Sequence, residues 1–121
     1  MRNLIFILML SAITAAAKPY SVKSPNGRLT VEVNTEENLT YSLAFDGEEI
    51  VQDSEIALLL ADGTVYGGKA KVKKATSRSV NESFQSSFYK KKEIRNDYNE
   101  LVLEFSKFSL VVRVYDDGAA Y

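Results

Sequence analysis

The sequence predicts an all-β fold, an antiparallel β-sandwich, and three observations lead to that prediction. Apolar and polar residues alternate through most of the chain after residue 17, which is the pattern of strands with one buried face. Turn-forming pairs such as Asp46-Gly47 and Asp117-Gly118 separate the alternating runs, as in β-hairpins. No stretch of ten or more residues in this part keeps the i, i+3, i+4, i+7 apolar stripe of an amphipathic helix.

Residues 1–17 have the features of a signal peptide. Arg2 supplies the basic start, residues 4–10 are an unbroken apolar run, and Ala15 and Ala17 place small residues before a cleavage site at Lys18. The apolar run is shorter than the roughly 20 residues that span a bilayer. We therefore expect a secreted or periplasmic protein that has no contact with the membrane after cleavage.

The first alternating runs predict strands at residues 29–33, 39–45 and 56–60, each with one half-buried face. Turn signals at 25–27, 46–47 and 62–63 bound these runs. Later apolar residues predict strands at 84–89, 101–105 and 108–114, with Ser106-Lys107 as the tight connection between the last two. Residues 119–121 follow a turn and begin a returning strand, so we expect residues 18–121 to be an incomplete sandwich domain.

Composition restricts the chemistry that the chain can perform. It has 121 residues with no His and no Cys, which excludes an imidazole base, a thiolate nucleophile, a disulfide and the usual zinc sites. Asp116-Asp117-Gly118 lacks the staggered spacing of a calcium loop and predicts a turn. The residues by themselves therefore indicate no catalytic, cofactor or metal site in this chain.

The charge pattern gives no reason to expect a nucleic-acid partner. The formal net charge is −1, although residues 69–78 hold five basic side chains and no acidic one. A phosphate-binding patch is one interpretation of this block. The simpler interpretation is that Lys69, Lys71 and Lys73 form the solvated face of a strand, and exposed lysines commonly protect strand edges.

The polar segment 93–100 runs directly into the apolar residues Leu101 and Leu103. If one strand continued through it, Arg95, Asp97 and Asn99 would share the inward face of those leucines, and a core cannot hold such groups unpaired. Three alternatives stay open at this point. The segment is a polar loop, or a bulge near Asn99 breaks the alternation, or the polar groups lie at the end of the sandwich and meet partners there.

Three ordered blocks of sequence resemble the amino-terminal domain of glycoside hydrolase family 97. The first is Ser-Pro-Asn-Gly-Arg-Leu at 24–29, which leads to Leu-Thr-Tyr-Ser-Leu at 39–43. The second is Lys-Glu-Ile-Arg-Asn-Asp-Tyr-Asn-Glu-Leu at 92–101, and the third is Val-Arg-Val-Tyr-Asp-Asp-Gly-Ala-Ala-Tyr at 112–121. Together they cover nearly all of the chain after residue 17.

This resemblance implies a domain that forms part of a β-super-sandwich and precedes a catalytic (β/α)8 barrel. Relatives of this kind are secreted or periplasmic α-glycosidases, of α-glucosidase or α-galactosidase type, that use calcium. Their catalytic carboxylates lie in the barrel, and the calcium-ligating Glu of the amino-terminal domain comes from a segment beyond the third block. We therefore assign no catalytic, cofactor or metal residue to this chain, and we expect the full-length parent to be the enzyme.

The resemblance also implies the partners of the chain, which are the barrel of the same polypeptide and, for the parent, a carbohydrate substrate. We expect the polar segment to help seat the sandwich on the barrel. A stand-alone secreted carbohydrate-binding or adhesion module is the alternative, and it would need a row of exposed aromatic side chains. The residues expected at the interface are Arg95, Asn96, Tyr98, Asn99 and Glu100.

Overall fold

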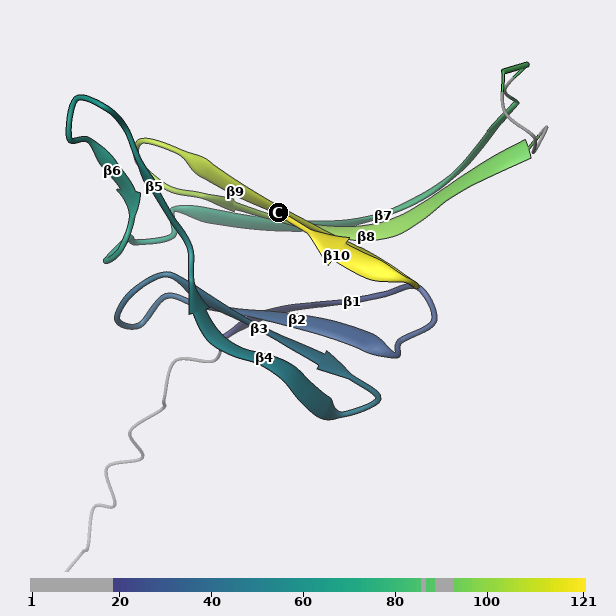
Figure 1. Ribbon diagram of the computed structural model, residues 1–121, viewed down its shortest axis with the longest axis horizontal. Coiled ribbons are helices and arrows are strands. Elements are labelled where there is room, and N and C mark those ends of the chain that lie inside the picture. Colours follow the sequence, from purple (N-terminus) through teal and green to yellow (C-terminus); the bar gives the residue numbers. More distant parts are fainter. Residues whose placement is uncertain (1–18, 86, 89–92) are drawn as a thin grey trace, which may run out of the picture.

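Two antiparallel β-sheets lie face to face, with a small hairpin at one end (Figure 1). This computed structural model describes residues 19–85, 87–88 and 93–121. The predicted signal peptide, residues 1–17, lies outside the described residues and stays a prediction. The strands are β1 (Tyr20–Lys23), β2 (Leu29–Asn34), β3 (Thr40–Phe45), β4 (Glu48–Glu55), β5 (Ala57–Leu59), β6 (Val65–Gly67), β7 (Lys74–Gln85), β8 (Glu93–Glu104), β9 (Ser109–Tyr115) and β10 (Gly118–Ala120).

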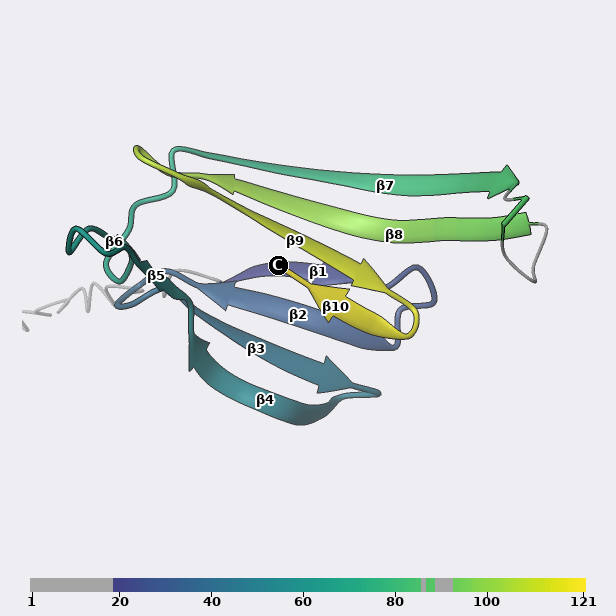
Figure 2. The ribbon, with the colours of Figure 1, turned by 45° about the horizontal axis from the view of Figure 1, so that its top comes forward.

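The first sheet has the strand order β1-β2-β3-β4, so each strand pairs with the next along the chain (Figure 2). In β2, Leu29, Val31 and Val33 are buried while Glu32 between them is exposed, which confirms the strand predicted at 29–33. Asp46 and its neighbour Gly47 both have positive φ, 50° and 80°, as a type I′ hairpin turn between β3 and β4 requires.

The second sheet has the order β10-β9-β8-β7, and its inner face packs on the first sheet with β8 opposite β1 and β9 opposite β2. Short turns connect β8 to β9 and β9 to β10, because Ser106-Lys107 and Asp116-Asp117 each allow an immediate reversal. The predicted all-β antiparallel sandwich is therefore confirmed. The buried apolar cluster between the sheets consists of Val22, Leu29, Val31, Val33, Leu39, Ile56, Leu101, Leu103, Phe105, Leu110, Val112 and Val114.

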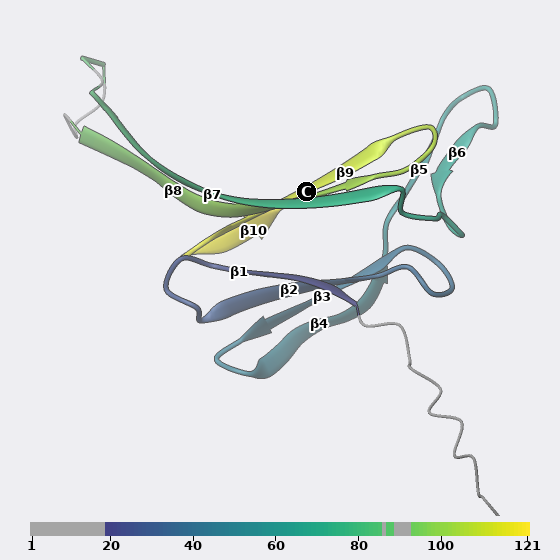
Figure 3. The same cartoon turned by 180° about the vertical axis from the view of Figure 1, so that it is seen from behind.

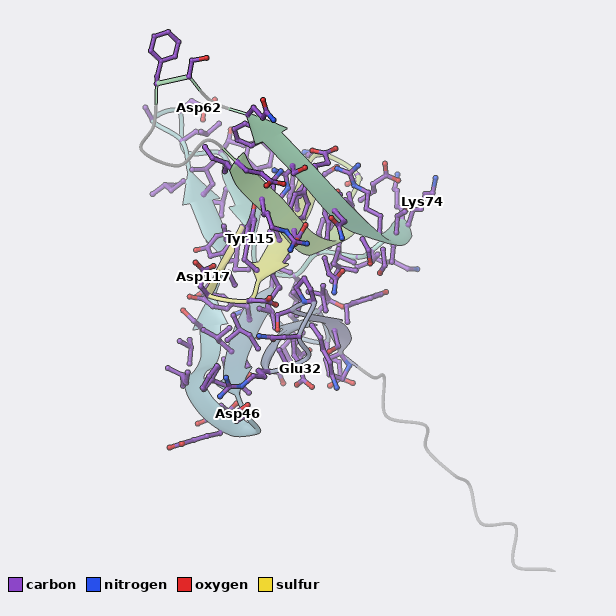
Figure 4. All side chains as sticks on the ribbon, turned by 90° about the vertical axis from the view of Figure 1, so that its right-hand side faces the viewer. Glu32, Asp46, Asp62, Lys74, Tyr115 and Asp117 are labelled. Atoms are coloured by element: carbon purple, nitrogen blue, oxygen red, sulfur yellow. The ribbon has the colours of Figure 1, made fainter. Side chains whose placement is uncertain are left out.

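The two sheets are also tied together at the end that faces the viewer in Figure 4, where the turns containing Asp46 and Asp117 lie. The backbone N–H of Asn26, in the turn after β1, donates to Oδ1 of Asp116 at 2.9 Å. Arg28 forms a two-bond pair with Asp46 across the same end of the first sheet. The predicted turns at 25–27, 46–47 and 116–118 thus close this end of the sandwich.

The prediction of a half-buried strand at 56–60 is wrong for most of that run. Ile56 belongs to the core, but Leu58 and Leu59 are 57% and 72% exposed. They belong to β5, which pairs only with β6 in a two-stranded hairpin beyond the stacked sheets. Alternation predicts which side of a strand is apolar, but it does not predict whether another sheet covers that side. No other sheet covers β5 in the described structure, so its leucines stay exposed.

Strand β7, which has 12 residues like β8 and forms an edge of the second sheet, was not predicted. The predicted strand at 84–89 overlaps it only at residues 84–85, and residues 86 and 89 lie outside the described part of the chain. The lysines at 69–73 lie in an irregular link before β7 and not on a strand, as the simpler interpretation had placed them. The strand β7 is a sheet edge with hardly any buried residues on either face, so it has little apolar alternation to recognise.

Candidate functional site

The polar segment 93–100 is part of β8, which pairs with β7 without any shift of register from Glu93 opposite Gln85 to Glu104 opposite Lys74. The segment is therefore neither a loop nor a bulge. Because side chains alternate along a strand, Arg95, Asp97 and Asn99 share the inward side with Leu101, while Asn96, Tyr98 and Glu100 share the opposite, outward side. The five residues expected at an interface are thus divided between two faces.

The inward-pointing groups lie at the end of the sandwich and find partners there, as one of the three alternatives proposed. Asn99 donates from Nδ2 to the carbonyl oxygen of Lys23 at 2.7 Å. Arg95 pairs with Asp97 at 3.1 Å. The second carboxylate oxygen of Asp97, Oδ1, is buried and has no hydrogen-bond partner among the described residues.

On the outward face, a row of three charged residues crosses three strands. Register places Arg78 of β7 and Arg113 of β9 directly opposite Glu100 of β8. Their Nε atoms donate to the two carboxylate oxygens of Glu100 at 2.6 Å and 2.7 Å, respectively. The Glu100 residue is only 4% exposed although it points away from the core. The bonds from Arg78 and then Arg113 outweigh burial and lower the pKa of Glu100 below its usual value.

Aromatic rings continue this row along β8 and β9. The rings of Tyr98 and Tyr115 lie 5.2 Å apart, and the guanidinium carbon of Arg113 lies 4.8 Å from the centre of the Tyr98 ring. Tyr98 is buried as a result, although it also points away from the core. We call Arg78, Glu100, Arg113, Tyr98 and Tyr115 the outer cluster.

Tyr98 and Glu100 are among the residues predicted from the sequence, whereas Arg78 and Arg113 are not. Arg113 could have been found, because a tight turn at Ser106-Lys107 puts residues 100 and 113 opposite each other. Arg78 could not, because β7 itself was not recognised. In the outer cluster, two half-exposed guanidinium groups share one carboxylate, which leaves one net positive charge.

Neither a metal site nor a membrane span is found in the described part of the chain. No three acidic side chains there converge on a position that could hold a metal ion, so we derive no calcium site from these residues. The Asp116 carboxylate is used in the turn described above. No helix among residues 19–85, 87–88 and 93–121 is long and apolar enough to cross a membrane.

Comparison with known protein families shows which family this sandwich belongs to. The sequence pattern of the family described as Glycosyl-hydrolase 97 N-terminal matches residues 22–121. The chain belongs to this family. The match contains both sheets apart from the first two residues of β1, and it contains the whole outer cluster.

Individual relatives agree with the family. A retaining alpha-galactosidase of Bacteroides thetaiotaomicron is 37% identical over an alignment of 125 positions, which covers all of this chain but only 19% of that protein. A glycoside hydrolase family 97 enzyme from Pseudoalteromonas sp. strain K8, solved with panose, superposes with a TM-score of 0.75 at 19% identity, over 83% of this chain and 16% of that one. A beta-arabinopyranosidase superposes with a TM-score of 0.70 at 19% identity, over 80% of this chain and 16% of that one. The family 97 chain therefore spans about a fifth of the length of its relative.

Proposed function

We propose that this family 97 chain is the non-catalytic amino-terminal domain of a secreted or periplasmic, calcium-dependent α-glycosidase. The observation that supports the proposal is the family match over residues 22–121 in a chain that equals only 19% of a related alpha-galactosidase. The catalytic barrel would follow in the same polypeptide. The substrate would be an α-glucoside or α-galactoside, and calcium would bind in the parent.

The role of the domain in this proposal is to support the barrel through the distal part of β8. Arg95, Asn96, Tyr98, Asn99 and Glu100 all belong to β8, and the first part of this strand extends past the first sheet (Figure 3). Polar side chains at the end of a sandwich suit an interdomain contact, because such contacts are more polar than a core. The proposal assigns catalysis to the barrel of the same polypeptide.

The first test is to read the coding sequence beyond codon 121 and to express the complete polypeptide. The proposal expects an open frame of barrel length and hydrolysis of nitrophenyl α-galactoside or α-glucoside. It further expects that chelation abolishes the activity and that calcium, but not magnesium, restores it. A stop codon after Tyr121 would refute the proposal and favour a stand-alone carbohydrate-binding module. An open frame without hydrolysis of either substrate would refute the α-glycosidase activity.

A further inference from the structure

The basic block of the sequence begins in an irregular link, residues 68–73, between β6 and β7. The two apolar residues of this link, Ala70 and Val72, pack against the buried apolar cluster. The three lysines that alternate with them are exposed. Because the link is not a strand, the need to protect a strand edge does not account for these lysines.

A hollow of about 590 Å³ lies at this end of the molecule, lined by the link, by β6 and by the turn that joins β8 to β9. Figures 2 and 3 show these three segments gathered at the same end. All three lysines of the link line the hollow, and Lys107 lines it from the turn. The volume falls within the range of pockets that hold small ligands, about 300–1,000 Å³.

Aromatic rings form one wall of the hollow. The half-buried rings of Tyr66 and Phe108 line it and meet edge to face, with their centres 5.8 Å apart. The Phe108 ring in turn stacks on Phe105, a member of the buried apolar cluster, at 4.5 Å. The core therefore holds this wall in place. Pockets for small ligands commonly combine such a wall with a few polar groups.

The charged groups around the hollow all have the same sign. Among the described residues, no acidic side chain lines the hollow, and none of its four lysines forms a salt bridge. Glu36 and Glu37 line a neighbouring hollow, which they share with Lys69 and Lys71. An anion in the larger hollow would be attracted by several ammonium groups that the fold already brings close together.

We propose that this hollow binds an acidic sugar, a pyranose that carries a carboxylate or a sulfate. The ammonium groups would pair with the anionic group, and the wall of Tyr66 and Phe108 would lie against the apolar face of the ring. The choice of a sugar rests on the proposed function, because a carbohydrate-hydrolysing parent works among sugars. The lysines that would hold the anionic group are Lys69, Lys71, Lys73 and Lys107.

The test measures binding to the complete polypeptide by isothermal titration calorimetry. The acidic probes are a galacturonate trisaccharide and a sulfated galactose, which distinguish a carboxylate from a sulfate. Maltotriose is the neutral control, and ATP is an anion that has a ring but is not an acidic pyranose. The double variant Lys71→Gln/Lys107→Gln removes charge from two sides of the hollow. Lys74→Gln is the matched control, because Lys74 directly follows the link and is exposed but does not line the hollow.

At least one acidic sugar should bind, and the double variant should bind it at least about tenfold more weakly, because it loses two charge-assisted contacts. The Lys74→Gln variant should bind like the wild type. The site is overturned if no acidic sugar binds, if maltotriose or ATP binds as tightly as the acidic sugars, or if Lys74→Gln loses as much affinity as the double variant.

A second measurement needs no variant in the hollow. Acetylation of the lysines in the wild-type polypeptide is followed by mass spectrometry of the peptides, with and without a saturating acidic sugar. Lys71 and Lys107 should react as fast as Lys74 without the sugar and severalfold more slowly with it. Slow reaction without the sugar would show that the rest of the polypeptide covers the hollow and would overturn the site. Binding without α-glycoside hydrolysis would refute the proposed activity and keep the site, whereas hydrolysis without binding would refute only the site.

Discussion

Replacing Glu100 by Gln should destabilise the domain, because it keeps the shape of the side chain and removes its charge. Each of the two cross-strand contacts of Glu100 falls in a class that contributes ~0.2–1 kcal/mol. Solvent around the half-exposed arginines screens both contacts. We therefore expect the Glu100→Gln variant to lose about 1 kcal/mol of unfolding free energy at pH 7. Hydrogen exchange of the β8 amides in the complete polypeptide at increasing urea concentration, followed by mass spectrometry, measures this loss.

The loss should also depend on pH, in a direction set by the lowered pKa of Glu100. A carboxylate whose pKa is lower in the folded state stabilises that state fully above its unfolded pKa, and the contribution disappears as the pH falls through the folded pKa. The wild-type and Glu100→Gln proteins should therefore differ at pH 7 and converge in acid, below the usual carboxyl range.

The matched control is Glu104→Gln, on the same face of the same strand but exposed. A surface substitution of this kind should change the unfolding free energy by less than about 0.5 kcal/mol. The reasoning fails if Glu100→Gln is as stable as the wild type at pH 7, if the two variants are equally destabilised, or if the difference between wild type and Glu100→Gln grows as the pH is lowered.

Other predictions concern the core, a turn and the edges. Leu103→Ala removes a fully buried side chain, so it should cost about 2–5 kcal/mol in the same urea experiment. Gly67→Ala should lower the free energy of unfolding by about 1–3 kcal/mol, because φ is +118° and the new Cβ would clash with the carbonyl oxygen of Ile56. Gly63→Ala should lower it less, because Gly63 also has a positive φ but its new Cβ would meet open space. Residues 18–121 without further domains should be marginally stable or self-associating, because β4 and β10 are sheet edges; a monomer in size-exclusion chromatography with one sharp unfolding transition would contradict this.

Sequence alone predicts the parts of this fold that obey one simple rule. Strand β2 and strand β9 have a buried face and a solvated face, so their alternation identifies them and their turns. Strand β7 has no such contrast, since Ala75 and Ser77 on its inward side are as exposed as the residues on the other side. Strand β5 is apolar in sequence but lacks a covering layer, since all three of its residues are exposed, and periodicity cannot show whether another layer is present.

The candidate site was harder to predict because it depends on register. The five residues of segment 93–100 were grouped by their position along the chain, whereas a strand sends neighbours to opposite faces. Which residues lie beside Glu100 depends on the lengths of the two hairpin connections of β8. The Ser106-Lys107 turn can be recognised in the sequence, and it places Arg113 opposite Glu100. The connection before β8 cannot be recognised, so the position of Arg78 opposite Glu100 cannot be predicted.

The polar segment 93–100 is best understood as the place where β8 changes its apolar side. From Leu101 onward the apolar residues point inward, toward the first sheet, whereas Tyr98 and Ile94 point outward. A strand covered by one layer along its whole length has no reason to make this change, because its apolar side would stay the same. Strand β8 is covered by the first sheet only along its body, so beyond Asn99 no such layer keeps its apolar side inward. The charged pairing of Glu100 occurs at the crossover, where both sides need polar groups that are satisfied, and this explains why a sequence without continuous alternation still forms one uninterrupted strand.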